Sequence, residues 1–128
     1  MDILRIDKTE FTPAVIFDAD EMSLSIIGAS RPENAQEFYE PLKIWLGEFN
    51  SSKNVIASIP LNIQVKISYF NSPSLIELLE VFKTIRLIHK KGQKVLVDWH
   101  YDKDDELIFE TAQDISDIIE IPFNFIED

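Results

Sequence analysis

The residues with the clearest chemical potential lie in the short block Asn71-Ser72-Pro73-Ser74-Leu75. Ser72 has the residue type of a helix N-cap, and Pro73 suits the first position of the helix that follows. A serine hydroxyl at such a position is expected to face solvent beside free backbone N–H groups. An N-cap serine is by itself an ordinary structural feature, so the type and spacing alone do not separate a structural role from a chemical one.

A phosphate on Ser72 would add about two negative charges at the positive end of a helix, where the macrodipole and unbonded N–H groups tolerate them. The fold is therefore expected to survive the modification, whereas the surface would change. In a chain with a formal charge of −11, this added charge would turn an accepted protein contact into a repelled one. We therefore predict Ser72 as a phosphorylation site. The predicted partner-binding residues are Asn71, Ser72, Pro73, Ser74 and Leu75.

A second group of polar side chains runs from His100 to Glu106, and its carboxylates are of the type that binds Mg²⁺ or Ca²⁺. The EF-hand pattern fails here, because Leu107 stands where the sharp-turn glycine belongs. The alternative is a strand-to-helix turn in which Asp104, Asp105 and Glu106 meet the positive end of a helix. The sequence favours this structural role, and we expect no metal site.

Sequence motifs of nucleotide-dependent and hydrolytic enzymes do not occur in the chain. Its three glycines, Gly28, Gly47 and Gly92, are too few and too dispersed to form a phosphate-binding loop. His89 is best explained as a cation at the C-terminal end of a helix. We therefore expect no catalytic residue and no cofactor, and a protein that works by binding other proteins.

Composition and charge limit the partners and the location. With 12 Lys and Arg against 23 Asp and Glu, the chain repels nucleic-acid phosphates and anionic membranes. It has no cysteine, which excludes disulfides and thiolate chemistry. The N-terminal residues carry mixed charges, and no apolar run approaches the roughly 18 residues that cross a bilayer. We expect a cytoplasmic protein that binds neither nucleic acid nor membrane.

The 128 residues are predicted to form one domain, since no linker or repeat interrupts them. A β-hairpin is expected at Ala14–Phe17 and Ser23–Ile27, around a polar turn. Further strands are predicted at Leu61–Phe70 and Lys94–His100, and a closing extended segment at Ile121–Ile126. In the strand Leu61–Phe70, Ile63, Val65, Ile67 and Tyr69 are expected on one face. Residues 50–60 are expected to form a polar loop.

Three helices are expected between the strands, at Pro32–Phe49, Pro73–Lys90 and Asp104–Ile118. In the first, Ser30 and Glu33 have capping-box spacing, and Pro41 predicts a kink or two short helices. The second helix has apolar residues over more than one stripe, so it either packs on two sides or presents a protein-binding patch. The fold class is therefore α/β (α+β), a mixed sheet with an N-terminal hairpin and about three helices packed on it.

At these residues the sequence resembles the SiaC family, small bacterial phosphoproteins related in fold to STAS domains and anti-sigma factor antagonists. The blocks that carry the resemblance span nearly the whole chain. They are Arg31-Pro32-Glu33-Asn34-Ala35, Phe38-Tyr39-Glu40-Pro41 with Trp45-Leu46, Tyr69-Phe70-Asn71-Ser72, Val97-Asp98-Trp99-His100-Tyr101-Asp102 with Asp104-Asp105-Glu106, and Ile121-Pro122-Phe123-Asn124. Several such blocks in the same order are more specific than any one of them.

The resemblance implies that Ser72 is phosphorylated by a dedicated Ser/Thr kinase and dephosphorylated by a PP2C-type phosphatase. It also implies that the unphosphorylated protein binds and activates a diguanylate cyclase, which promotes biofilm formation. Pro73 departs from the small hydroxyl residue usual in the family, and Leu75 from a common lysine, so Ser74 is a second candidate phosphosite. Two other functions stay open: an antagonist that sequesters an anti-sigma-type kinase, and a metal-assisted hydrolase using the carboxylates of residues 98–106.

Overall fold

The computed structural model describes residues 1–52 and 58–128, which form six strands and three helices. The strands are β1 (Leu4–Ile6), β2 (Ala14–Asp18), β3 (Ser23–Ser30), β4 (Leu61–Phe70), β5 (Val95–Tyr101) and β6 (Phe123–Glu127). The helices are α1 (Ala35–Ser51), α2 (Ser72–Lys90) and α3 (Glu106–Ile119). The predicted hairpin is β2–β3, and the predicted strands and helices lie within a few residues of these bounds. β1 is an additional strand that the sequence did not reveal, because three residues are too few to show a period.

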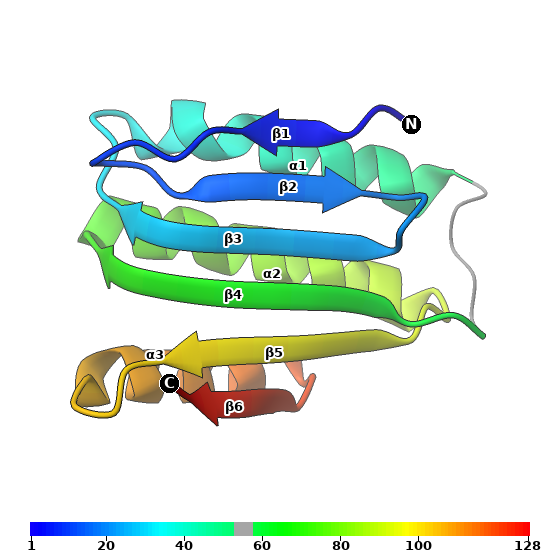
Figure 1. The fold of residues 1–128 in the computed structure, drawn as a ribbon. Coiled ribbons are helices and arrows are strands. Elements are labelled where there is room, and N and C mark those ends of the chain that lie inside the picture. The colour runs from blue at the N-terminus through cyan, green and yellow to red at the C-terminus, as the bar shows by residue number, and fades with distance from the viewer. Residues whose placement is uncertain (53–57) are drawn as a thin grey trace.

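The six strands form one sheet in sequential order, β1-β2-β3-β4-β5-β6. β1, β2 and β3 pair antiparallel, whereas β3, β4, β5 and β6 pair parallel, so the sheet is mixed as predicted. Each parallel pair is joined through one helix. Because successive crossovers have the same hand and advance across the sheet in the same direction, their helices fall on one face. Figure 1 shows all three helices behind the sheet, which leaves its other face uncovered.

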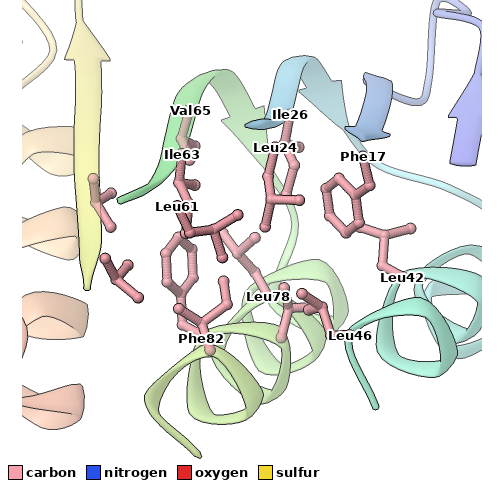
Figure 2. Packing of buried hydrophobic residues seen from close by; sticks show 14 of the residues in the cluster. Phe17, Leu24, Ile26, Leu42, Leu46, Leu61, Ile63, Val65, Leu78 and Phe82 are labelled. Carbon is pink, nitrogen blue, oxygen red and sulfur yellow. The ribbon is translucent and has the colours of Figure 1, made fainter. Parts of the chain in front are cut away.

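The core lies between the sheet and the helices. Figure 2 shows side chains of β2, β3 and β4 meeting those of α1 and α2. Alternate residues of β4 supply its centre, and Leu61, Ile63, Val65 and Ile67 are at most 2% exposed. The alternation that predicted this strand therefore also identified its buried face.

Helix α1 begins later than its predicted capping box. Asn34 is the N-cap, and its side-chain oxygen accepts the backbone N–H of Glu37 at 3.1 Å. Ser30 belongs to the end of β3, where its hydroxyl is buried against Tyr39 instead of capping a helix. The prediction was wrong because a serine at a strand end has a buried hydrogen-bond partner available.

Pro41 does not divide α1, which runs as one helix from Ala35 to Ser51. Proline removes the N–H that would bond the carbonyl of Glu37, four residues earlier. Pro41 and Glu37 both lie on the exposed side of the helix, where water can bond the freed carbonyl. The buried side chains on the opposite side hold the helix against the sheet. They are Tyr39, Leu42, Trp45, Leu46 and Phe49.

Tyr69 was predicted on the buried face of β4, and this was wrong. The register between β3 and β4 shifts after Gly28, so that Gly28 pairs with Ile67 and Ala29 pairs with Tyr69. The extra residue, Ser68, forms a bulge that reverses the alternation. Tyr69 is consequently 51% exposed.

Helix α2 was predicted either to pack on two sides or to present an exposed apolar patch, and it does both in part. It packs between α1 and α3, and its buried residues include Val81, Phe82 and Ile85. Ile76 and Leu87 are nevertheless 62% and 56% exposed. The predicted polar loop 50–60 begins later than expected, because α1 continues to Ser51, and its residues 53–57 lie outside the described residues.

Candidate functional site

The segment Asn71–Leu75 forms the turn where the chain leaves β4 and begins α2. The backbone N–H of Asn71, just after β4, donates to the carbonyl of Ser30, the last residue of β3, at 3.1 Å. Because β3 and β4 are parallel, they end at the same edge of the sheet, as Figure 1 shows. The predicted partner-binding segment therefore lies at a sheet edge beside the start of α1.

Asn71, and not Ser72, caps helix α2. The Asn71 backbone is extended, and its side-chain oxygen accepts the N–H of Ser74 at 3.0 Å. Its carbonyl accepts the first helical bond, from the N–H of Leu75 at 3.1 Å. Ser72 is thus the first residue of the helix and Pro73 the second. The Ser72 hydroxyl therefore has no capping role, contrary to the prediction.

The two candidate phosphoserines differ sharply in access to solvent. Ser72 is exposed, whereas Ser74 is 0% exposed. The Ser74 hydroxyl also has no hydrogen-bond partner among the described residues. A kinase can therefore reach Ser72 on the folded protein, while Ser74 requires the first turn of α2 to open.

Two buried polar contacts anchor the elements around this turn. The hydroxyls of Ser30 and Tyr39 lie 2.7 Å apart and join the end of β3 to α1. Burial raises the pKa of the Tyr39 phenol to about 12, so this contact stays neutral. The ammonium of Lys43 donates to Glu77 at 2.7 Å and joins α1 to the second turn of α2. This hydrogen bond raises the pKa of Lys43.

A surface hollow of about 340 Å³ separates the start of α1 from the start of α2. Pro73 and Ile76 line its α2 side, and Glu33 and Glu77 contribute carboxylates. A second hollow shares Glu33 and continues along α1. The surface next to Ser72 therefore combines apolar and acidic groups, which is a suitable composition for a protein contact but not for a phosphate-binding loop.

The acidic run before α3 has the predicted structural role. Asp105 is the N-cap, and its side chain accepts the N–H of Ile108 at 3.1 Å. Glu106 lies in the first helical turn, where it complements the helix dipole. Within residues 1–52 and 58–128, no three His, Cys, Asp or Glu side chains are grouped as possible ligands of a metal ion.

A polar network that no sequence motif indicated lies on the uncovered face of the sheet. Asp98 accepts hydrogen bonds from Gln64 at 2.6 Å and from Asn124 at 3.0 Å. These two bonds hold the pKa of Asp98 below its usual value, and the bond from Gln64 contributes most. His100 bonds Gln64 at 2.8 Å, so it belongs to this network and not to the acidic turn. Alternation places these residues on one face, but only the strand register brings them together.

Comparison with known proteins identifies the family. The model of the SiaC family of regulatory phosphoproteins matches residues 6–128. The chain belongs to the SiaC family. It is also 28% identical over 123 residues to a protein of Pseudomonas aeruginosa strain UCBPP-PA14 described as uncharacterized, covering 96% of this chain and 94% of that protein.

Solved structures of SiaC from Pseudomonas aeruginosa share the fold. The structure of the diguanylate cyclase SiaD in complex with its activator SiaC matches with a TM-score of 0.86 and 27% identity, over 98% of this chain and 99% of that one. Apo-SiaC matches with a TM-score of 0.87 and 27% identity over the same shares. A third SiaC structure gives 0.88 and 26% identity over 100% of both chains. Together they confirm the predicted family and the mixed sheet with three helices.

The SiaC-family match describes a regulatory phosphoprotein but does not say which residue carries phosphate. Ser72 and Ser74 therefore remain predictions, distinguished here by their exposure. Of the helices in the described part of the chain, none has the length and apolar character needed to cross a membrane.

Proposed function

We propose that this SiaC-family chain is a cytoplasmic, phosphorylation-switched adaptor that binds and activates a diguanylate cyclase when it is unphosphorylated. A Ser/Thr kinase adds the phosphate and a PP2C-type phosphatase removes it. The effector is supported by the near full-length similarity to the SiaC that activates SiaD. Phosphorylation is supported by the description of the family as regulatory phosphoproteins.

The observation that carries the proposal is the free, exposed hydroxyl of Ser72 at the first position of α2. Asn71 already caps the helix, so the Ser72 hydroxyl is available for modification without loss of a structural bond. Ser74, two residues later, is buried. These two facts favour Ser72 over Ser74 as the phosphorylated residue.

The electrostatics of this position favour a change in binding over a change in folding. A phosphate at the start of a helix carries about two negative charges near the positive end of the helix dipole, where it is tolerated. The nearby hollow already contains Glu33 and Glu77. Added negative charge therefore makes this surface repel an acidic partner, while the anchored core beneath it stays in place.

A regulatory role without catalysis is supported by the positions of the histidines. His100 bonds Gln64 and Asp128 on the uncovered face of the sheet, and His89 contacts the carbonyl of Gln93 beyond the end of α2. Neither histidine contacts Ser72. We therefore propose that the serine is a substrate of another enzyme, and not a nucleophile of this one.

Reconstitution with a purified diguanylate cyclase from the same organism tests the proposal. Cyclic-di-GMP synthesis is measured with the wild type, Ser72→Ala, Ser72→Asp and protein carrying phosphoserine at position 72. We expect activation by the wild type and by Ser72→Ala. We expect Ser72→Asp to bind more weakly by about 1–3 kcal/mol, or roughly 5- to 150-fold, and the phosphorylated protein to activate least.

The matched control is Ser58→Asp, which adds the same charge at another exposed serine, before the start of β4 and thus at the opposite end of that strand from Ser72. It should activate like the wild type. Mass spectrometry after treatment with the cognate kinase should place the phosphate on Ser72. Equal activation by phosphorylated and unphosphorylated protein would show that Ser72 is not the switch, and phosphate on Ser74 alone would assign the site to that residue.

A further inference from the structure

Arg31 follows the last residue of β3 and is held by two aromatic rings. Its guanidinium carbon lies 5.1 Å from the centre of the Phe11 ring and 5.8 Å from that of Tyr69. The two rings are 50% and 51% exposed. The backbone N–H of Arg31 also donates to the carbonyl of Phe11 at 2.8 Å. The three side chains thus form a solvent-facing group, which we call the Arg31 cluster.

The charge of Arg31 is not neutralised within the described part of the chain, where it forms no ion pair with a carboxylate. Other cations do: Arg86 contacts Glu120 at 2.8 Å, and Lys43 contacts Glu77 at 2.7 Å. A guanidinium packed on ring faces keeps in-plane N–H donors, and these match a carboxylate or phosphate. Arginine and tyrosine are also enriched among the residues that dominate protein interfaces.

The backbones of Arg31 and Ser72 lie close together because of the sheet topology. The hydrogen bond from the N–H of Asn71 to the carbonyl of Ser30 joins the two chain segments. Along the chain, Arg31 directly follows Ser30 and Ser72 directly follows Asn71, the two residues that this bond joins. Neighbouring strands lie about 5 Å apart, so both residues leave the sheet from the same small area of its edge. The bulge at Ser68 contributes directly, since it turns Tyr69 outward to support the guanidinium.

From this arrangement we propose that Arg31 is the anion-binding residue of the switch. In the unphosphorylated protein it binds an Asp or Glu side chain of the partner protein. When Ser72 is phosphorylated, the phosphate binds the guanidinium and the partner carboxylate is displaced. The proposal deepens the proposed function and rests on Ser72 as the modified residue.

With Arg31 in this role, a single phosphate is expected to weaken binding even though the protein is already strongly acidic. The formal charge of −11 would repel an acidic partner segment everywhere unless a local cation accepted it. Arg31 supplies such a cation next to the modified serine. Phosphate therefore removes the attractive contact and adds repulsion at the same place, which produces a larger change than either effect alone.

The first test needs no partner and no kinase. Phosphoserine is placed at position 72 by genetic encoding, and the second pKa of its phosphate, ordinarily about 6, is measured by ³¹P NMR titration. Contact with the guanidinium should lower this pKa, so Arg31→Gln should raise it by roughly half a pH unit or more. The control is Arg5→Gln, at an exposed arginine of β1, which should leave it unchanged. Equal pKa values in the wild type and Arg31→Gln would overturn the contact.

The second test measures binding of the purified diguanylate cyclase to the same variants. Arg31→Gln should weaken binding by the unphosphorylated protein about tenfold or more, and Arg31→Lys should recover only part of it. Phosphorylation should then have a smaller further effect in Arg31→Gln than in the wild type. Wild-type affinity in Arg31→Gln, or a phosphate effect of undiminished size, would refute the role of Arg31.

The two tests separate the failure of this inference from that of the proposed function. If phosphorylation releases the cyclase equally from the wild type and from Arg31→Gln, the result refutes the role of Arg31 but supports the switch at Ser72. A cyclase that is unaffected by phosphorylation in the wild type contradicts the switch itself, and with it the release mechanism assigned to Arg31.

Discussion

Replacing Asn71 by alanine should destabilise the protein, whereas replacing Ser72 by alanine should leave its stability nearly unchanged. The structure gives the capping bond to Asn71, whose side chain accepts the N–H of Ser74 at 3.0 Å. The hydroxyl of Ser72 takes no part in the cap. The pair of variants therefore measures directly which of two adjacent cap-type residues starts α2.

The expected loss in Asn71→Ala follows from what that substitution removes. Alanine keeps the backbone bonds to Ser30 and Leu75, so only the side-chain bond is lost. Loss of an N-cap costs about 0.5–2 kcal/mol. Ser74 is 0% exposed, so water cannot readily replace the lost bond, and we expect about 1–2 kcal/mol. Ser72→Ala changes an exposed residue and should stay within about 0.5 kcal/mol.

Urea unfolding followed by far-UV circular dichroism measures both values. With a slope of about 1–3 kcal/mol per molar urea, a loss of about 1–2 kcal/mol in Asn71→Ala should lower the midpoint by roughly 0.3–2 M. Asn71→Asp is the matched control, because aspartate also caps helices, and it should retain most of the stability. A greater loss in Ser72→Ala than in Asn71→Ala would refute the assignment of the cap.

Three further predictions concern the core and the uncovered face of the sheet. Trp45→Ala should cost about 3–5 kcal/mol, because the indole stacks on Phe49 at 5.6 Å; a loss under about 1 kcal/mol in urea melts would contradict this packing. Tyr39→Phe should cost about 1–3 kcal/mol by leaving the buried Ser30 hydroxyl unpaired, and a neutral result in the same assay would exclude that bond. The lowered pKa of Asp98 stabilises the fold above the ordinary carboxyl pKa of about 4, and this contribution is lost as the pH falls through the folded-state pKa. Asp98→Asn should thus be less stable at pH 7, with the difference narrowing in urea melts below about pH 4; a pH-independent difference would contradict the assignment.

Regular periodicity explains why most elements could be predicted from the sequence. The alternation of apolar and polar residues in Leu61–Phe70 and the apolar stripe of the first helix each indicate which side of the element faces the core. The two misplaced caps have a different origin. Ser30 and Asn34 lie four residues apart and Asn71 and Ser72 are adjacent, and all four are of residue types that can cap a helix. For the first helix, the choice of cap depends on the tertiary partner that Tyr39 offers to Ser30, and this is not encoded locally.

The candidate site was predicted in position but not in detail. The order strand, serine, proline, apolar helix was enough to place Ser72 at the start of α2. That Ser72 is exposed and Ser74 is buried could be seen only from the packing of the first turn of α2. The approach of Arg31 to Tyr69 required the parallel register of β3 and β4 and its bulge, neither of which a single sequence reveals.

A phosphate can change binding without changing the fold only if the helix that carries it is held independently of that residue. Several contacts meet this condition at the start of α2. Asn71 joins the helix to β3 through its backbone and caps it through its side chain. Glu77 joins it to α1 through Lys43, and Ser74 is packed beneath the surface. Because none of these contacts uses the Ser72 hydroxyl, we expect a phosphate on Ser72 to change the charge of the exposed surface while the contacts that hold α2 stay intact.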